Sequence, residues 1–462
     1  MPLLLVGVLL VSGCTAYRPR PIDPAALATV RAAARLDPDA VARRLAVLSP
    51  GAAWNRHDWD RLALFAAAIE GNPAIAAARA AVATAAAAAR AARVRQGPTL
   101  TLTGEYARNA PEKSPWLFGG VLDVPVETGG RRTARLAGID LGVIAARQDY
   151  AETVWSVRMA LRRAVTDRLL ADRQMRLFDA ITGLRQRQFA AMQRRVDAGA
   201  ASRAELERVR ADGADAVRRR ADAATLSTTA DAAIAAALGV PASAIAGLVL
   251  VWEDFDKPAP AFASDDASVR SAAVAVRADV LKAVVAYDSS EADLRGEVAK
   301  QYPAINIAPG YTWERGLVKL PLAIGLVLPP LDGNRSAIAA AAARRTEAGA
   351  KLETSIAAAQ SEIDRALVGV RQTRQLLLKL RLGESPAALR LAVQADREIA
   401  AGSIDRTEWA AAQSGARLTE ASELEALARV HAADAALEDA LRRAVSGPEL
   451  QMTRTGARKA GI

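Results

Sequence analysis

The side chains that most often perform chemistry are scarce in this sequence. It contains one cysteine, Cys14, and two histidines, His57 and His431, which lie far apart in the chain. A Ser/His/Asp triad or a histidine-rich metal site therefore has almost no residues from which to form. The phosphate-binding loop Gly-x-x-x-x-Gly-Lys is also missing from the sequence. Composition alone leaves carboxylate-only catalysis open, but no acidic pair stands apart from the helix-surface charge. We predict no enzymatic activity, no catalytic residue, no cofactor and no metal site.

Cys14 offers a different chemistry, which is lipidation. Residues 2–13 form an apolar run, shorter than the roughly 20 residues of a membrane-spanning helix but typical of a signal-peptide core. The run ends in VSGC, which resembles a bacterial lipoprotein signal. The resemblance implies a signal peptide at 1–13, a palmitate-type lipid anchor on Cys14 and, from Thr15, export to the outer membrane. A plain secretory signal with an incidental cysteine is the alternative. No Lys or Arg precedes the run, so the position of the start codon stays open.

Composition predicts long helices instead of a compact core. Apolar residues make up 51% of the chain and aromatic residues only 4%, with alanine abundant, and alanine is the best helix former. The 61 basic and 51 acidic residues leave a net charge of +10. They are interleaved along helical stretches, as solvated helix faces prefer. We therefore predict no nucleic-acid partner.

Two segments 205 residues apart interrupt the helical pattern in the same way. They are QGPTLTLTGEY at 96–106 and QYPAINIAPGY at 301–311. Each has a proline at its third position, which cannot continue a helix, and then alternates in the period of a strand. Similarity extends on both sides, so we predict a duplicated helix–strand–strand–helix repeat. The expected strands lie at about 98–107, 116–126, 303–313 and 317–329.

Very long helices are expected to follow the strands. No proline occurs between Pro125 and Pro241. The helical pattern from about Thr133 to Asp197 corresponds to about 100 Å of helix, too long for a compact domain. The Ser385-Pro386 pair predicts a kink or a restart in the second long helix. No helix of 20 apolar residues is evident in the sequence.

The strands are expected to meet a membrane. Four aromatic residues near the strand ends suit an interface girdle: Tyr106, Trp116, Tyr311 and Trp313. Four strands are too few to close a barrel, and an open sheet edge cannot lie in lipid. Other copies must therefore complete the sheet, and three chains would supply twelve strands. The predicted fold is mainly α, with a small β-barrel part.

Two copies of a Gly-x-x-[Ser/Asp]-Arg-x-Glu pattern predict the turns of two helical hairpins. In each copy a glycine ends one helix and a polar N-cap starts the next. The residues concerned are Gly199, Ser202 and Glu205, and then Gly402, Asp405 and Glu408. The two glutamates are also what the first turn of any helix favours.

With these motifs in order, residues 54–445 resemble the TolC family of outer-membrane efflux proteins, in its lipidated form. The run VETGGRR at 126–132 is similar to the heavy-metal efflux branch. The resemblance implies a homotrimer with a twelve-stranded transmembrane barrel, a long periplasmic α-helical barrel and an equatorial belt. It also implies a periplasmic adaptor protein and an inner-membrane pump of the resistance–nodulation–division (RND) type as partners. Glu205 and Glu408 match the acids of the family's periplasmic gate, whereas Arg208 and Ala411 depart from its second acidic position.

The domain boundaries follow from the repeat. We expect these parts: signal peptide 1–13, lipidated equatorial segment 14–60, first repeat 61–240, equatorial link 241–270, second repeat 271–445 and disordered tail 446–462. The predicted function is a passive outer-membrane exit duct for small molecules or metal ions delivered by a pump. A non-pore periplasmic coiled-coil lipoprotein scaffold is the alternative, and a scaffold would not need the strand pairs. The cargo, the particular adaptor and pump, and the open or closed state stay undetermined by the sequence.

Overall fold

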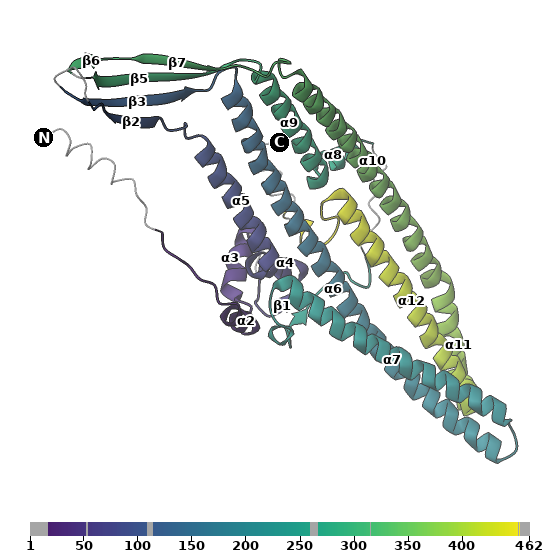
Figure 1. The fold of residues 1–462 in the computed structure, drawn as a ribbon. Helices are drawn as coiled ribbons and strands as arrows, with labels where there is room; N and C mark the ends of the chain where they lie inside the picture. The colour runs from purple at the N-terminus through teal and green to yellow at the C-terminus, as the bar shows by residue number, and fades with distance from the viewer. Residues whose placement is uncertain are drawn as a thin grey trace.

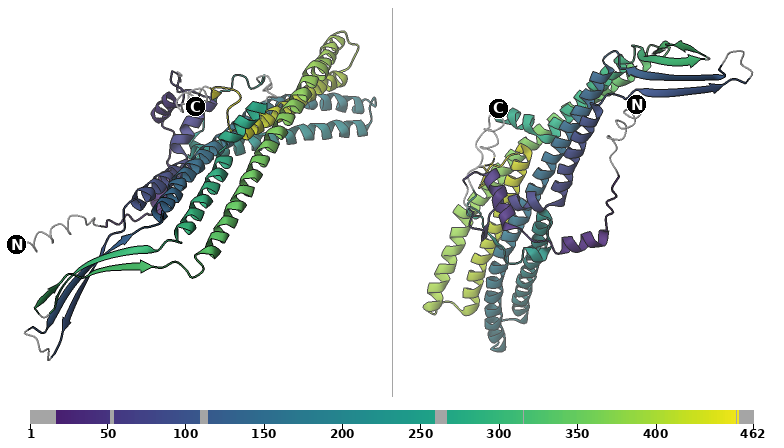
Figure 2. Two further views of the ribbon diagram at one scale, coloured as in Figure 1. Left: turned by 90° about the horizontal axis from the view of Figure 1, so that it is seen from above. Right: turned by 90° about the vertical axis from the view of Figure 1, so that its left-hand side faces the viewer.

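The computed structural model describes residues 17–51, 54–108, 114–258, 267–314, 316–450 and 452. Long helices run side by side, with a sheet projecting from one end and two helical hairpins at the other (Figure 1). The short helices near the N-terminus lie beside the middle of the long helices (Figure 2). We call this middle region, where the N-terminal helices meet the long helices, the waist.

The first half of the chain alternates helices and strands in the predicted order. Its elements are α2 (Pro24–Ala32), α3 (Pro38–Leu48), β1 (Asp58–Trp59), α4 (Arg61–Gly71), α5 (Pro73–Ala92), β2 (Thr99–Tyr106), β3 (Trp116–Val126), α6 (Arg131–Asp197), α7 (Arg203–Leu238), a 3₁₀ turn (Ala242–Ala244) and β4 (Val249–Leu250). The 67-residue α6 is about 100 Å long. Strand β1 pairs with β4 in parallel, which joins the N-terminal segment to the link between the halves.

The second half repeats this order. Its elements are α8 (Ala267–Val276), α9 (Ala278–Ala299), β5 (Ala304–Glu314), β6 (Leu317–Lys319), β7 (Leu322–Val327), α10 (Arg335–Lys379), the π-helical turn η2 (Leu380–Glu384), α11 (Ser385–Ala400) and α12 (Arg406–Leu441). The predicted restart at Ser385 thus takes the form of a π turn without a break, and α10, η2 and α11 continue into one another.

One antiparallel sheet combines strands from both halves. Its order is β2-β3-β5, and β6 and β7 both pair with β5. The strand expected over 317–329 is therefore two short strands. They are separated at Pro321, which has no amide hydrogen to donate to the ladder. Its carbonyl instead accepts a bond of 2.7 Å from the Gly310 amide. Among the described residues, β2 and β7 leave their outer edges unpaired.

The buried core lies mainly at the waist. There α4 is almost completely enclosed, with apolar residues from Leu62 to Ile69 packed against α3, α6 and α7. A second apolar cluster joins α8 and α9 to α10 and α12. The sheet, by contrast, has no residue in the buried class. Each half thus has its own apolar cluster, and the sheet, which pairs β3 of the first half with β5 of the second, extends away from both.

The duplication is visible in the contacts that start the second helix of each half. The Asn72 side chain caps α5 and donates a 2.8 Å bond to the Ala237 carbonyl. The corresponding Arg277 precedes α9 and donates a 2.9 Å bond to the Ala440 carbonyl. Ala237 and Ala440 lie at the ends of α7 and α12, where helix carbonyls lack partners within the helix. An amide and a guanidinium thus perform the same structural task in the two halves.

Two sequence expectations need correction. Helix α5 is, among the described residues, the one helix long and apolar enough to span a membrane by length and composition. The expectation that the sequence contains no such helix was wrong, because the many alanines of α5 raise its mean hydropathy. A single helix of this kind is weak evidence for a membrane span. The tail expected to be disordered from residue 446 is ordered at its start. Glu449 there is 2% exposed, because arginines at the waist hold its carboxylate.

Candidate functional site

The sheet has two chemically different faces, which the strand register defines. Residues directly opposite in an antiparallel pair point to the same face. Leu100 faces Leu122, and Phe118 faces Trp313. We call this side the apolar face; its members are Leu100, Leu102, Gly104, Tyr106, Trp116, Phe118, Gly120, Leu122, Val124, Val126, Ile305, Ile307, Pro309, Tyr311, Trp313, Leu322, Ile324 and Leu326. None of them carries a charge, and the only polar groups are the hydroxyls and ring nitrogens of aromatic residues.

We call the other side of the sheet the polar face, although Leu117, Val121 and Val327 also lie on it. Its residues alternate with those of the apolar face and include Thr99, Thr101, Thr103, Glu105, Asp123, Asn306, Thr312 and Glu314. On the apolar face, Leu102 is 76% exposed and Ile324 is 63% exposed. An exposed apolar surface of this extent marks a site of interaction with membrane or protein. At the tilt of about 40° that barrel strands adopt, the eight residues of β2 would span a height of about 20 Å and the eleven of β3 about 29 Å. These heights bracket the apolar band of a membrane barrel, about 25 Å.

Aromatic rings gather at one end of the apolar face. Tyr106 and Trp116 meet edge to face with centroids 4.9 Å apart, Trp116 stacks on Phe118 at 5.5 Å, and Phe118 stacks near Trp313 at 6.3 Å. Three of the four predicted girdle residues thus lie in one row, with Phe118 as a member that the sequence analysis missed. Tyr311 lies on the same face, opposite Gly120.

The two predicted hairpin turns lie at the far end of the long helices. Gly199 and Gly402 have φ of 70° and 71°, the left-handed conformation that glycine adopts without strain. Ser202 and Asp405 each cap the following helix with their side chains. In return, the Ser202 amide donates to the Glu205 carboxylate and the Asp405 amide donates to the Glu408 carboxylate. Both turns are therefore complete capping boxes.

Glu205 and Glu408 each use one carboxylate oxygen, Oε2, in these caps. Bonds from the Ser202 amide and hydroxyl lower the pKa of Glu205. The tip also contains a contact between the two hairpins that the sequence analysis did not anticipate. Arg195 of α6 forms an ion pair with Asp405, and the Arg187 guanidinium lies 5.9 Å from the ring centre of Trp409. The two hairpins are thus linked through side chains of opposite halves.

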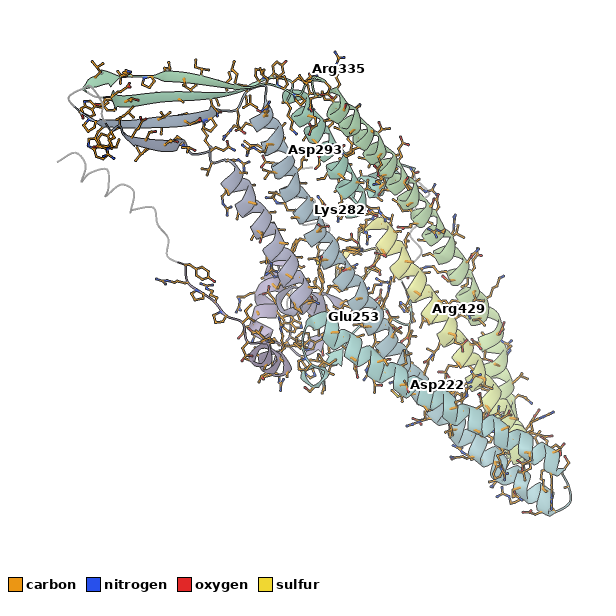
Figure 3. The ribbon with its side chains drawn as sticks, in the orientation of Figure 1. Asp222, Glu253, Lys282, Asp293, Arg335 and Arg429 are labelled. Atoms are coloured by element: carbon orange, nitrogen blue, oxygen red, sulfur yellow. The ribbon has the colours of Figure 1, made fainter. Side chains whose placement is uncertain are left out.

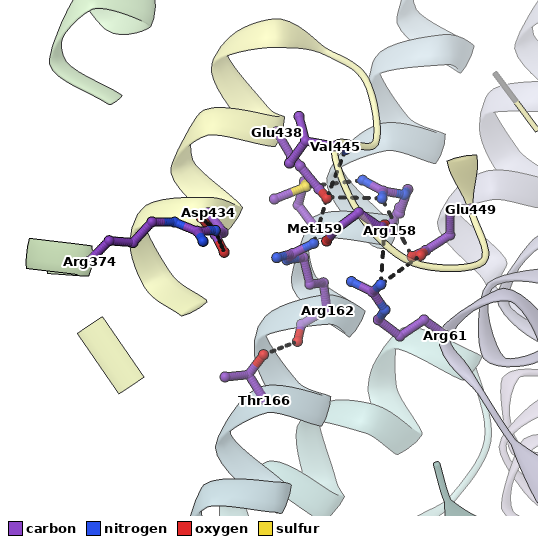
Figure 4. A network of polar contacts seen from close by, with 11 residues as sticks. Arg61, Arg158, Met159, Arg162, Thr166, Arg374, Asp434, Glu438, Val445 and Glu449 are labelled. Atoms are coloured by element: carbon purple, nitrogen blue, oxygen red, sulfur yellow. Dashed lines mark hydrogen bonds and ion pairs between the residues drawn. The ribbon is translucent and has the colours of Figure 1, made fainter. Parts of the chain in front are cut away.

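A buried ionic cluster occupies the waist (Figure 4). We call it the waist cluster; its members are Arg61, Arg158, Arg162, Glu438 and Glu449. Glu438 Oε2 lies 2.9 Å from Arg158 Nη2, and Glu438 Oε1 lies 2.6 Å from Arg162 Nη1. Burial opposes ionisation of Glu438, but the arginines overcome this effect and lower its pKa. The cluster joins α4, α6, α12 and the C-terminal segment.

His431 lies next to this cluster and is 2% exposed. Its Nε2 is 2.8 Å from the Phe255 carbonyl, and its ring stacks on Phe255 at 4.3 Å. Burial lowers the pKa of His431 to about 4, and Arg162 and Arg61 act in the same direction. The histidine is therefore neutral at physiological pH and attaches the link between the halves to α12.

Two further kinds of chemistry considered in the sequence analysis are lipidation at Cys14 and metal binding. Cys14 lies outside the residues that the structure describes. Within those residues, no group of three or more His, Cys, Asp or Glu side chains is placed to hold a metal ion. Charged side chains are distributed along the whole length of the helices, from Arg335 near the sheet to Asp222 on α7 (Figure 3).

Comparison with known proteins agrees with this architecture. Residues 64–240 match the family described as outer membrane efflux protein. Among curated protein sequences, none matches. Residues 64–240 are therefore similar to outer membrane efflux proteins, and the predicted resemblance to the TolC family is confirmed.

Solved structures share the fold over most of the chain. A membrane protein from Pseudomonas aeruginosa is 20% identical, with a TM-score of 0.66 over 82% of this chain and 92% of that one. VceC, an outer membrane protein of Vibrio cholerae, is 17% identical, with a TM-score of 0.66 over 83% and 96%. The open state of the MtrE outer membrane channel of Neisseria gonorrhoeae is 18% identical, with a TM-score of 0.65 over 82% and 88%. The predicted outer-membrane location with a periplasmic extension agrees with these channels.

Proposed function

We propose that three copies of this chain form an outer-membrane pore that serves as the exit duct of a tripartite efflux system. The observation that carries this proposal is the sheet, with one uncharged face and two unpaired outer edges. Three such sheets placed edge to edge provide twelve strand positions, a number within the range of membrane barrels. The apolar face would then meet lipid, and the polar face would line the lumen.

The direction of the edge strands supports closure. β2 and β3 are antiparallel, as are β3 and β5, and β5 and β7. β2 and β7 therefore run in opposite directions, so β7 of one chain can pair with β2 of the next in the same antiparallel pattern. Closure also removes the open edges, which lipid does not tolerate. The aromatic row of Tyr106, Trp116 and Trp313 would lie at one membrane interface, with Tyr311 deeper in the band.

The helices and the N-terminus complete the proposal. The long helices would extend into the periplasm and end at the two hairpin turns, where a periplasmic adaptor protein and an RND-type pump would supply small molecules or metal ions. A lipid on Cys14 would add a second attachment to the outer membrane, since stable anchoring takes more than one acyl chain or an inserted element. Transport through such a duct needs no chemistry from the chain itself.

Single-channel conductance of the purified protein in planar bilayers tests the duct, with its mass in mild detergent recorded alongside. A trimer with discrete conductance steps is the expected result. A monomer or dimer that conducts neither alone nor with its adaptor would refute the proposal and favour a scaffold without a pore.

Glu205 and Glu408 are proposed to contribute to a gate at the hairpin turns. Glutamine can return the same capping-box bond without charge, so Glu205→Gln and Glu408→Gln separate the electrostatic role from the capping role. If the carboxylates surround the pore, the glutamine variants change ion selectivity while the unfolding temperature stays the same. If Glu205→Ala and Glu408→Ala lower the unfolding temperature while the glutamine variants leave ion selectivity unchanged, the two residues are helix caps and the gating role is wrong.

A further inference from the structure

The waist cluster has an unequal number of positive and negative charges. Arg61, Arg158 and Arg162 are 4%, 3% and 2% exposed, and Glu438 and Glu449 are 0% and 2% exposed. The neighbouring pair of Arg374 and Asp434 is balanced, and the adjacent His431 is neutral. Three guanidinium groups therefore pair with two carboxylates, and all five side chains are at most 4% exposed. Arginine does not lose its proton in proteins, so one positive charge is left over.

Several hydrogen-bond donors of the same arginines have no partner. Arg61 Nη1, Arg158 Nε and Arg162 Nε are buried and make no hydrogen bond within the described part of the chain. A buried donor without a partner destabilises the folded state, and an uncompensated buried charge destabilises it more. Folded proteins rarely leave three such donors around an excess charge.

Aromatic contacts do not remove this excess. The Arg61 guanidinium lies 4.0 Å and the Arg162 guanidinium 5.5 Å from the ring centre of Trp252. A cation–π contact stabilises less than an uncompensated buried charge destabilises. Both arginines also approach the same ring, so their mutual repulsion persists; burial first, and then Arg162 and Arg158, weaken the protonated form of Arg61 and lower its pKa.

We propose that the waist cluster binds one small monovalent anion of the halide class, held by the free donors of Arg61, Arg158 and Arg162. One such ion would neutralise the cluster and accept the three unpartnered N–H groups. A cavity of about 560 Å³ borders Arg61 and Trp252, but Asp58, Asp60 and other acids line it. Acidic walls repel anions, so the ion is taken up during folding and exchanges slowly afterwards.

Bromide diffraction tests the site directly. The full-length protein would be produced in sodium bromide or in sodium gluconate, because slow exchange makes soaking unreliable. We expect an anomalous peak within hydrogen-bond distance of Arg61 and Arg162 in the bromide form. A water molecule at that place in the bromide form, or no density, would overturn the proposal.

Stability at constant ionic strength gives a second readout that does not depend on channel activity. Bromide that replaces gluconate is expected to stabilise the fold. Above the Kd of the site for bromide, each tenfold rise in bromide concentration should lower the unfolding equilibrium constant of each chain tenfold. Arg162→Met should abolish this dependence. Glu449→Gln increases the positive excess and should lower the Kd, which keeps the test valid if Arg162→Met does not fold. Arg93→Met removes an arginine from the exposed pair with Asp140 and should leave the dependence unchanged. Equal stability in both salts, or a dependence that persists in Arg162→Met, would refute the site.

Discussion

A lysine placed on either side of β2 distinguishes a membrane sheet from an ordinary one. Leu102 lies on the apolar face, opposite Gly120, and the next residue, Thr103, lies on the polar face, opposite Gly119. Both occupy the middle of the strand and both are exposed. Leu102→Lys and Thr103→Lys therefore introduce the same charge at nearly the same depth, on opposite faces.

The expected penalty is large on one face only. A lysine on the lipid side of a barrel at the bilayer midplane costs about 2–4 kcal/mol, which corresponds to a roughly 30- to 700-fold loss in the assembly equilibrium. Each pore would contain three such lysines. On the polar face the ammonium group meets water, and we expect a cost below about 0.5 kcal/mol.

The measurement is the folding equilibrium of each variant in lipid vesicles over a range of urea concentrations, together with the amount of trimer in outer-membrane fractions. The Leu102→Lys protein should assemble poorly, whereas the Thr103→Lys protein should assemble like the wild type with an altered ion selectivity. Equal losses in both variants, or a larger loss for Thr103→Lys, would refute the assignment of the two faces.

Three further predictions concern the waist and the turns. Glu438→Gln leaves buried arginines without their partner and should lower the free energy of unfolding by about 3–5 kcal/mol. Asp140→Asn, in an exposed pair, should lower it by less than about 1 kcal/mol. Urea unfolding of both variants measures the difference, and similar losses would contradict the buried pairing. The pKa of His431 falls from 6.5 in the unfolded chain to about 4 in the fold, so the unfolded state binds the proton more readily. Stability should therefore fall by about 3 kcal/mol on account of this group as the pH drops from 6.5 to 4. Urea unfolding over this pH range should show a shallower slope in His431→Gln, and an unchanged slope would contradict the buried neutral histidine. Gly239 and Gly199 have similar φ, 73° and 70°, but only at Gly239 would a Cβ meet backbone atoms, 2.4 Å from the nearest one. Gly199→Ala should lower the free energy of unfolding by about 1–2 kcal/mol, and Gly239→Ala should lower it clearly more. Thermal unfolding measures both variants. The reverse order would disprove the close packing of Gly239 against the backbone.

Local signals explain how much of the fold the sequence reveals. Pro98 and Pro303 mark the start of strands because proline ends a helix by its own chemistry. Gly199 and Gly402 mark helix ends for a similar reason, since their conformation depends on the residue itself. The two faces of the sheet follow from alternation within each strand. The division at Pro321 uses the same chemistry, and sequence analysis could have predicted it.

The waist cluster shows where sequence reasoning fails. Arg158 and Arg162 are four residues apart on one face of α6, a spacing that also describes an ordinary solvated helix face. Their partners Glu438 and Glu449 lie about 280 residues away, and Glu449 belongs to a stretch with little apolar surface. Only the packing of α4 and α12 against α6 identifies these charges as buried. At the π turn of Leu380–Glu384, Arg381 likewise contacts partners distant in sequence, Glu423 and the Asp256 carbonyl.

The unpaired edges β2 and β7 have a consequence for biogenesis. A lone chain that entered the bilayer would carry two rows of unbonded amides and carbonyls into hydrocarbon, at several kcal/mol for each group. If three chains close the barrel as proposed, stepwise insertion faces a barrier that only the third subunit removes. Assembly would then depend steeply on the concentration of the chain, and a chain that waits in the periplasm would expose its apolar face until its partners arrive.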